Sequence, residues 1–514
     1  MINNFLISNS LFMPIGLLFF GAIFNFMIGS FYKRGSNKNQ ALFCGVIASM
    51  VLIAAMANFY KLSVGVIATG KGIFSGNFMA YYPAFYSSSS VALQLDPIGV
   101  LFGGIILVLG FLVTVYSAKY MQDDNRAKRY FTLLLLMIAG MLGVALSADM
   151  FNMYVFFELM SIASYILIAY NRNAEAVEAS FKYLVYGSVG TMIALFGMSI
   201  LFQVTGTLNF EQIYNKMHTL PSNVVLIAAV LIITGFGVKS AMVPLWFPDA
   251  HTTAPAGIAA LLSGALLKVG VLAIIKSLLV LPAASAGLAL AIMAAIAMTI
   301  GNFMALTQSE LNRMLAYSSV AQLGYIILGI GLGMKYGLLT GIEGGLFHIL
   351  THSFMKGAAF LIAGAFIYRA ATGKISDLRG ISEKMPLMSI CFAIACLALA
   401  GIPPFSGFMS KLLIYKTGIE LNCGLGLFFT CIAIFNSILS CGYYLPLINT
   451  IYSRKQSEIV ASSKSIIEAP FLITVPVLVM TTLTIVMGVY PEFGLNFVKP
   501  AANAILVTLG GFKL

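Results

Sequence analysis

The feature that most constrains this chain is the recurrence, along almost its whole length, of apolar runs of about twenty residues or more. Runs of this length cross a bilayer as helices, whereas the strands of a membrane barrel alternate over segments of about ten residues. Only 9% of the 514 residues are charged, against about 25% in soluble domains, and so few charges cannot cover a water-facing surface. The sequence therefore excludes a soluble protein and predicts an all-α polytopic membrane protein.

We expect about fourteen transmembrane helices. If the N-terminus lies outside, the inner loops hold about twice as many lysines and arginines as the outer segments. Because positively charged loops stay on the inner side of a membrane, this count favours a multi-pass protein with both termini outside. The predicted spans are 10–31, 41–60, 97–118, 130–148, 150–170, 181–205, 223–246, 254–280, 284–306, 315–333, 338–369, 386–416, 423–452 and 470–490.

Composition also limits the partners and cofactors. The formal net charge of +12 would suggest nucleic acid in a soluble protein, but in a membrane protein it reflects basic inner loops, so we expect lipids and no nucleic acid as partners. The six cysteines form no CxxC pair, which argues against iron–sulfur, zinc-knuckle and disulfide sites. The sequence contains no P-loop, and we expect no catalytic centre, cofactor or metal in this chain.

Five charged residues fall well inside apolar runs: Glu158, Lys239, Lys268, Lys356 and Lys411. A charge at the centre of a bilayer costs at least about 2.5–3.5 kcal/mol, so such residues are functional candidates by default. A single pair could equally lock two helices together, but five residues on five predicted helices favour function. Lysine suits a proton carrier because its neutral amine can accept a proton, which arginine cannot do near neutral pH.

Lys239 stands directly before a group of prolines in VKSAMVPLWFPDAHTTAPAG, which includes Pro244 and Pro248. Proline inside a helix frees a backbone carbonyl and bends the axis. Broken helices within a membrane are tolerated only inside protein or beside a water-filled cavity. We therefore predict a broken helix here, with a route to water for the lysine.

A second break is predicted in GIPPFSGFMSK, where Pro403 and Pro404 precede Lys411 by about two turns. Two proline-interrupted spans in corresponding places of two halves are the sequence sign of inverted repeats with an ion site between them. Lys239 and Lys411 are separated by the number of predicted helices that a five-helix repeat requires.

His348, His352 and Lys356 follow at i, i+4 and i+8 in one predicted helix and form a ladder with steps of roughly 6 Å. Two histidines one turn apart can hold zinc, but no HExxH glutamate accompanies them and Glu343 is the one acid nearby. Purely structural histidines are a second alternative. We favour a proton relay, because imidazole titrates closest to neutral pH and passes protons between its two nitrogens.

Glu158 shares a narrow polar stripe with Ser161 and Tyr165 on an otherwise apolar helix. We expect its carboxylate to pair with a lysine, and a lysine whose counter-ion comes and goes is a switchable proton carrier. Lys268 lies between the two breaks in the sequence. Lys276 follows eight residues later, and we expect it to snorkel to the outer surface.

Several stretches carry a resemblance to a known family, namely FFELMSIASYILIAY, EASFKYLVYGSVGT, TGTLNF, VKSAMVPLWFPDAHTTAPAGIAALLSGALLKVG, ELNRMLAYSSVAQLGYIILG and LAGIPPFSGFMSKLLIYK. Over residues 95–450 the chain resembles the antiporter-like membrane subunits of respiratory complex I, Mrp-type Na⁺/H⁺ antiporters and membrane-bound energy-converting hydrogenases. The resemblance implies fourteen helices, two inverted five-helix repeats, broken helices seven and twelve, and both termini outside.

The resemblance also implies a division of the chain and roles for single residues. Glu158 and Lys239 would form a gated ion pair, Lys268 would be the central lysine of helix eight, and Lys411 would face the outer exit. The ladder of two histidines and a lysine is similar to that of the Mrp D-subunit and hydrogenase branch. The implied segments are helices 1–3 with an outer loop in 1–129, a first inverted repeat in 130–280, a second in 281–452, and helix 14 with a tail in 453–514.

Taken together, the resemblance implies a proton-translocating subunit of a multi-subunit complex in a prokaryotic cytoplasmic membrane. Its partners would be homologous antiporter-like subunits, small membrane subunits and, in a redox-driven enzyme, a peripheral arm with iron–sulfur or nickel–iron centres. One alternative is a stand-alone secondary transporter of a small solute, which predicts a substrate pocket at the midplane. Another is a structural membrane subunit that conducts nothing. The polar residues form a line rather than a cluster, which favours proton translocation.

Overall fold

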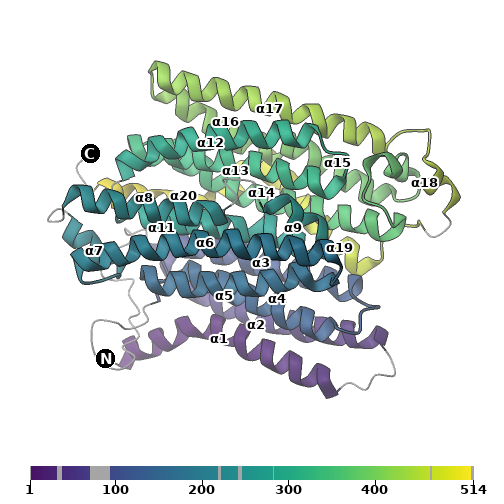
Figure 1. Cartoon of the computed structure of the whole chain (residues 1–514), viewed down its shortest axis with the longest axis horizontal. Coiled ribbons are helices and arrows are strands. Elements are labelled where there is room, and N and C mark those ends of the chain that lie inside the picture. The colour runs from purple at the N-terminus through teal and green to yellow at the C-terminus, as the bar shows by residue number, and fades with distance from the viewer. Residues whose placement is uncertain are drawn as a thin grey trace.

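The chain folds into a bundle of helices that lie side by side along the long axis of the molecule (Figure 1). The computed structural model describes residues 2–31, 37–69, 93–217, 221–240, 246–281, 283–463 and 466–510. Within these ranges, thirteen helices are long and apolar enough to cross a membrane, and Ile375–Glu383 with Pro386–Ala400 form a bent fourteenth candidate. The described residues contain isolated bridges but no strand, so the predicted all-α membrane fold is confirmed.

The helices follow one another through mostly short connections. In chain order they are α1 (Ile2–Phe31), α2 (Asn37–Thr69), α3 (Pro97–Tyr120), α4 (Ala127–Leu146), α5 (Met150–Ile168), η1 (Ala169–Asn171), α6 (Ala174–Thr205), α7 (Phe210–Lys216), α8 (Ser222–Lys239), α9 (Phe247–Thr253), α10 (Ala256–Leu261), η3 (Leu262–Leu266), α11 (Leu267–Leu278), α12 (Ala283–Leu306), α13 (Leu311–Tyr336), α14 (Leu339–Ala370), η4 (Ile375–Leu378), η5 (Ile381–Glu383), α15 (Pro386–Ala400), α16 (Ser406–Glu420), α17 (Gly424–Ile451), α18 (Glu458–Ser462), α19 (Phe471–Val489) and α20 (Pro491–Gly510).

The two halves of the bundle repeat the same pairwise packing. In the first half α4 packs on α5, α6 on α8, and α8 on α11. In the second half α12 packs on α13, α14 on α16, and α16 on α17. This recurrence is what two structural repeats of five spans produce. Helix α1 begins, and helix α20 ends, at the same end of the bundle (Figure 1).

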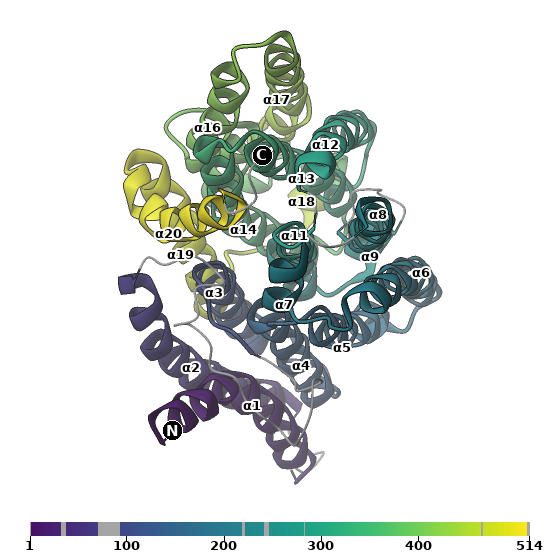
Figure 2. The same cartoon turned by 90° about the vertical axis from the view of Figure 1, so that its left-hand side faces the viewer.

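Three spans form the centre of the bundle: the segment from α10 to α11, α13 and α14 (Figure 2). Their most apolar stretches are completely enclosed by protein. The peripheral helices instead turn large apolar side chains outward, such as Phe20 on α1, Phe181 on α6 and Ile438 on α17. Such an outer face suits lipid tails, because apolar side chains cost nothing there whereas charged ones are expensive.

The first predicted break lies between α8, which ends at Lys239, and α9, which begins at Phe247. Pro244 falls outside the described residues. Pro248 stands in the first turn of α9, where its missing N–H leaves no helical hydrogen bond unmade. The predicted span 223–246 therefore ran past the end of α8. A short π-helix, η3, interrupts the next span, although no proline marks it in the sequence.

The second predicted break separates α15 from α16. Gly401 caps α15 with a positive φ of 88°, a conformation that costs glycine little, and Pro403 and Pro404 lie in the connecting segment. Each half has 15 residues and is therefore too short to cross a bilayer alone. The span expected as one helix over 386–416 is thus two half-helices.

The last predicted span, 470–490, matches α19, but a further helix follows it. Helix α19 stops at Val489, and the segment expected to be a tail is helix α20. A Cβ atom on Gly488 would lie 2.6 Å from the backbone nitrogen of Ser406. The end of α19 therefore packs directly against the break between α15 and α16, and glycine permits that approach.

Candidate proton-transfer site

The line of buried charges begins with an ion pair between α5 and α8. The Nζ atom of Lys239 donates to Oε1 of Glu158 at 3.0 Å and to Oγ of Ser161 at 2.6 Å. Lys239 is 1% exposed, whereas the Glu158 side chain is 23% exposed. Glu158 and Ser161 share one face of α5 because they are one turn apart. The structure thus brings together the two residues that the sequence paired.

Lys268, at the start of α11, is enclosed by the centre of the bundle. Its Nζ donates to the backbone carbonyl of Ser263 in the π-helix η3. The hydroxyl of Ser263 in turn lies 2.8 Å from that of Ser319 on α13. A π-helix shifts the regular backbone hydrogen-bond pattern, and here it offers a carbonyl to the ammonium group.

The predicted ladder on α14 is present and completely buried. The rings of His348 and His352 are 5.7 Å apart between centroids. Lys356 donates to the carbonyl of Leu315 at 2.7 Å and to the hydroxyl of Ser318. Neither nitrogen of His352 has a hydrogen-bond partner within the described part of the chain. The arrangement therefore leaves one imidazole of the ladder open to exchange a proton with a neighbour or a water molecule.

Lys411, on α16, closes the line at the second break. Its Nζ donates to the carbonyls of Leu399 at 2.9 Å and Ala400 at 3.2 Å. These carbonyls belong to the last turn of α15, where helical partners are missing and the helix dipole is negative. The ring of Tyr325 lies 4.6 Å from the same ammonium nitrogen. The broken helix thus creates the acceptors that hold this lysine.

Helix α13 supplies polar residues that the sequence did not single out. Ser318, Ser319, Gln322 and Tyr325 follow at i, i+1, i+4 and i+7 and share one face. Through their contacts this face reaches the environment of Lys268, Lys356, the histidine ladder and Lys411. The helical spacing of polar residues in LAYSSVAQLGY was the available signal, but uncharged residues did not stand out beside the lysines.

His251, on α9, is a further residue that the sequence analysis missed. It is fully buried, and its Nδ1 lies 2.9 Å from the carbonyl of Phe247. Its Nε2 has no hydrogen-bond partner among the described residues. Lys356 and Lys268 act on it electrostatically. The sequence feature that could have revealed it is its position shortly after the first helix break, in the stretch FPDAHTT.

Lys276 does not reach the surface as expected. It is 4% exposed and donates to the carbonyls of Ala145 at 2.7 Å and Ser147 at 2.9 Å. These carbonyls stand at the C-terminal end of α4, where helical partners are missing. The expected snorkelling is therefore wrong, because a helix end distant in sequence meets the ammonium inside the protein.

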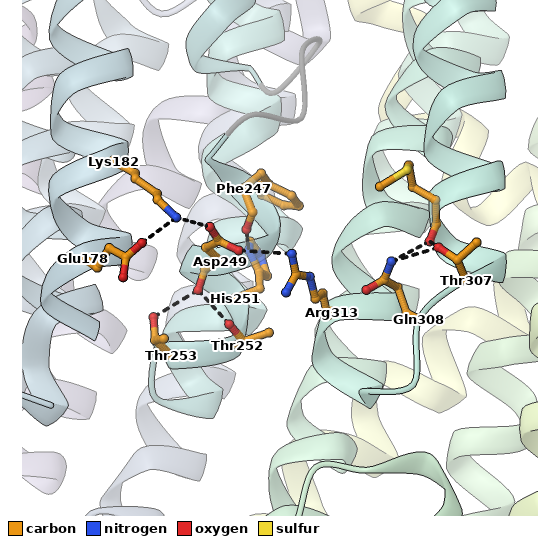
Figure 3. Close-up of polar contacts among 11 residues, drawn as sticks. Glu178, Lys182, Phe247, Asp249, His251, Thr252, Thr253, Thr307, Gln308 and Arg313 are labelled. Carbon is orange, nitrogen blue, oxygen red and sulfur yellow. Dashed lines mark hydrogen bonds and ion pairs between the residues drawn. The ribbon is translucent and has the colours of Figure 1, made fainter. Parts of the chain in front are cut away.

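The short helix α9 is fastened to its neighbours by charges (Figure 3). Asp249 pairs with Lys182 of α6 at 3.0 Å and with Arg313 of α13 at 3.5 Å. Lys182 also pairs with Glu178 at 2.8 Å. All four side chains are partly exposed, so this cluster lies outside the buried line and holds α9 in place beside it.

Comparison with known proteins identifies related families and relatives. Residues 147–440 match the family described as NADH:quinone oxidoreductase/Mrp antiporter, and residues 73–131 match the N-terminal region of complex I chain 5. Over 465 residues the chain is 32% identical to NADH-quinone oxidoreductase subunit N of Desulforudis audaxviator, covering 86% of this chain and 90% of that relative. It is 28% identical over 428 residues to the putative antiporter subunit mnhD2 of Staphylococcus haemolyticus, covering 82% and 81%.

Among solved structures, a chain of the membrane-bound sulfane sulfur reductase, an archaeal respiratory membrane complex, has the same fold. The TM-score is 0.86 at 28% identity, over 97% of this chain and 98% of that one. The family match covers more than half of the chain, and the relative from Desulforudis audaxviator is identical at nearly a third of the aligned positions. Both agree with the arrangement of the helices and with the family that the sequence motifs resemble. This chain belongs to the family of antiporter-like membrane subunits that NADH:quinone oxidoreductases and Mrp antiporters share.

Proposed function

We propose that this chain carries protons across a prokaryotic cytoplasmic membrane along the buried line of Glu158, Lys239, Lys268, the α14 ladder and Lys411. One observation carries the proposal: Lys268, the α14 ladder and Lys411 are joined through the polar face of α13. Lys268 reaches that face through Ser263, and Lys356 donates to it directly. Amines, imidazoles and hydroxyls in such an order can accept and release protons in turn.

The pair of Glu158 and Lys239 provides the control step. While Nζ of Lys239 stays 3.0 Å from Oε1 of Glu158, the carboxylate stabilises the ammonium form of the lysine. If the pair separates, the enclosed ammonium loses its counter-ion, and release of its proton to the next group becomes favourable. Separation of the Glu158–Lys239 pair therefore favours transfer of a proton from Lys239 to the titratable groups of the central spans.

The energy for this movement comes from partner subunits. The chain belongs to a family whose relatives include a subunit of an NADH-quinone oxidoreductase and a putative antiporter subunit. We place this chain in a multi-subunit membrane assembly with homologous antiporter-like subunits and small membrane subunits, both termini outside. A peripheral arm with iron–sulfur or nickel–iron centres would supply redox energy, whereas an assembly without such an arm would use an ion gradient.

The test is proton translocation by the native complex in sealed membrane vesicles. Lys239→Ala should abolish translocation while the complex still assembles, because a small apolar side chain fits among buried neighbours. Unchanged translocation would refute the relay, and loss of the whole complex would support a structural role instead. Translocation of a small solute by the purified chain alone, at the rate of the complex, would support the stand-alone transporter. Identifying the proteins that purify with the chain would distinguish a redox assembly from an antiporter.

A further inference from the structure

Gln322 lies in the middle of α13 and is fully buried. The two ends of its amide group contact separate elements. One end lies 3.0 Å from Nε2 of His348 on α14, and the other lies 3.0 Å from the backbone carbonyl of Leu399 at the end of α15. One side chain thus connects the ladder to the second helix break.

The chemistry of these partners determines which way the amide points. The carbonyl oxygen of Leu399 can only accept a hydrogen bond, so the amide end beside it must be the NH₂ group. The amide oxygen of Gln322 therefore faces His348. An amide oxygen also only accepts, so Nε2 of His348 must carry a hydrogen.

A neutral imidazole carries a single hydrogen, so with that hydrogen on Nε2 the lone pair is on Nδ1. Nδ1 of His348 lies 2.8 Å from the hydroxyl of Ser410 on α16, which can donate to it. When His348 is protonated, Nδ1 becomes a donor and the hydroxyl must turn away. The carbonyls of Ser406 and Gly407, each 3.2 Å from the Ser410 hydroxyl, can then accept its hydrogen. Both protonation states are therefore satisfied.

We propose that Gln322 is a positioning residue that holds His348 in its Nε2–H tautomer. His348 then takes up and releases its proton only at Nδ1, toward Ser410, the residue that precedes Lys411. Lys411 shares the Leu399 carbonyl with Gln322, donating to it at 2.9 Å. The Gln322 amide therefore connects Nε2 of His348, which exchanges no proton, to the Leu399 carbonyl, which also holds Lys411. The transport consequence rests on the proposed function, whereas the tautomer does not.

The charged and titratable groups around His348 come from four elements. The ring of Tyr325 on α13 lies 5.9 Å from that of His348 between centroids. Lys411 on α16, Lys268 on α11 and His352 on α14 act on the His348 ring or stack near it. All three are cationic when protonated, so none of them can accept the hydrogen of Nε2 in that form. Within the described surroundings, the oxygen of Gln322 is the acceptor that faces Nε2.

The direct test is nitrogen NMR of the full chain in lipid bilayers with ¹⁵N-labelled histidine. A bare ring nitrogen and a protonated one resonate far apart, so the tautomer is read without any transport assay. The chain has four histidines, and the His348→Asn variant identifies the signal of His348. We expect a neutral ring with hydrogen on Nε2. A hydrogen on Nδ1 in the wild type would overturn the proposal, whether or not the Gln322 variants fold.

Substitutions separate positioning from packing. Gln322→Leu keeps the volume but removes the oxygen, so hydrogen should appear on Nδ1 of His348. Gln322→Glu loses the donor to Leu399 but keeps an acceptor oxygen beside Nε2, so the hydrogen should stay on Nε2. Gln308→Leu changes a partly exposed glutamine between α12 and α13 (Figure 3) and should leave the signal unchanged. An unaltered tautomer in Gln322→Leu would refute the positioning role.

The same variants in the native complex give a second readout. Proton translocation should fall several-fold in Gln322→Leu and recover partly in Gln322→Glu. If the tautomer changes as expected but Lys239→Ala leaves translocation intact, the proposed function fails while the positioning role stands. If Lys239→Ala abolishes translocation but Gln322→Leu leaves the tautomer intact, the proposed function stands and the positioning role fails.

Discussion

The Nζ atom of Lys239 lies 3.0 Å from Oε1 of Glu158, yet only the lysine is fully enclosed, with 1% of its side chain exposed against 23% for the glutamate. The carboxylate is therefore the half of the pair that can exchange with its surroundings. The lysine depends on that carboxylate to remain charged inside the bundle. The asymmetry suits a pair that opens from the glutamate side.

Glu158→Gln should abolish proton translocation without preventing assembly. The variant keeps the shape of the side chain, and the enclosed lysine can release its proton rather than remain an unpaired cation. The measurement is translocation in sealed vesicles beside the amount of assembled complex. Glu178→Gln is the matched control, because Glu178 is 66% exposed and pairs with Lys182 on the surface of α6. Normal translocation in Glu158→Gln would contradict a role for the pair.

Lys411→Arg should lose translocation as completely as Lys411→Ala. Arginine keeps a positive charge beside the carbonyls of Leu399 and Ala400, but it does not release its proton near neutral pH. Loss in both variants, with assembly retained, separates proton release from charge. Lys416→Ala is the control, since Lys416 is 60% exposed in a surface pair with Glu420. Its rate of proton translocation should be within a factor of about two of wild type. Full activity of Lys411→Arg would show that a fixed charge suffices.

Gly488→Ala should destabilise the protein by about 1–3 kcal/mol. The added methyl group would lie 2.6 Å from the nitrogen of Ser406, and backbone atoms there cannot rotate away as a side chain could. Thermal unfolding in detergent, followed by the loss of monodisperse protein, measures the effect. Gly104→Ala is the matched control, because beyond the adjacent backbone of its own helix no atom lies within 4 Å of the added methyl group, and helix propensity makes it neutral or slightly stabilising. Equal stability of the two variants would contradict the close approach of α19 to the break.

Glu310, directly before α13, gives a pH-dependent prediction. Burial raises the pKa of its carboxyl above the ordinary 4.5, Arg313 opposes this and Glu175 adds to it. An acid whose pKa is raised by folding favours the folded state at low pH, and this contribution is lost as the pH rises from the ordinary pKa to the folded one. Glu310→Gln should therefore be more stable than wild type at neutral pH, with the difference vanishing below pH 4.5. Thermal unfolding measured from about pH 3.5, below the ordinary pKa of glutamate, to about pH 8 tests this, and a difference that grows on acidification would contradict it.

The fold was largely readable from the sequence because its signals are local. A run of apolar residues forms a membrane helix whatever its neighbours are, so the spans were found in order. Prolines disrupt helices through their own backbone chemistry, so both breaks were found too. The π-helix η3 and helix α20 were missed. The former has no proline, and the latter contains charged residues and prolines that are typical of a tail.

The site was only partly readable. Glu158, Lys239, Lys268, Lys356 and Lys411 were visible because a charge in an apolar run is costly wherever it lies. Gln322 was not visible, since an uncharged amide costs less and its importance comes from two partners on other helices. Lys276 was misjudged for a similar reason, because the carbonyls that hold it are more than a hundred residues away in the chain.

The sequence by itself determined that the chain is a bundle of membrane helices with two breaks and a few costly buried charges, because these properties follow from local hydropathy and backbone chemistry. Only the tertiary structure decided which groups meet. The pairing of Lys239 with Glu158, the capture of Lys411 by the last carbonyls of α15, and the bridge that Gln322 forms from His348 to Leu399 all depend on how distant helices pack. Hydrogen bonds act over about 3 Å, so residues far apart in sequence acquire partners only when folding brings them within that distance.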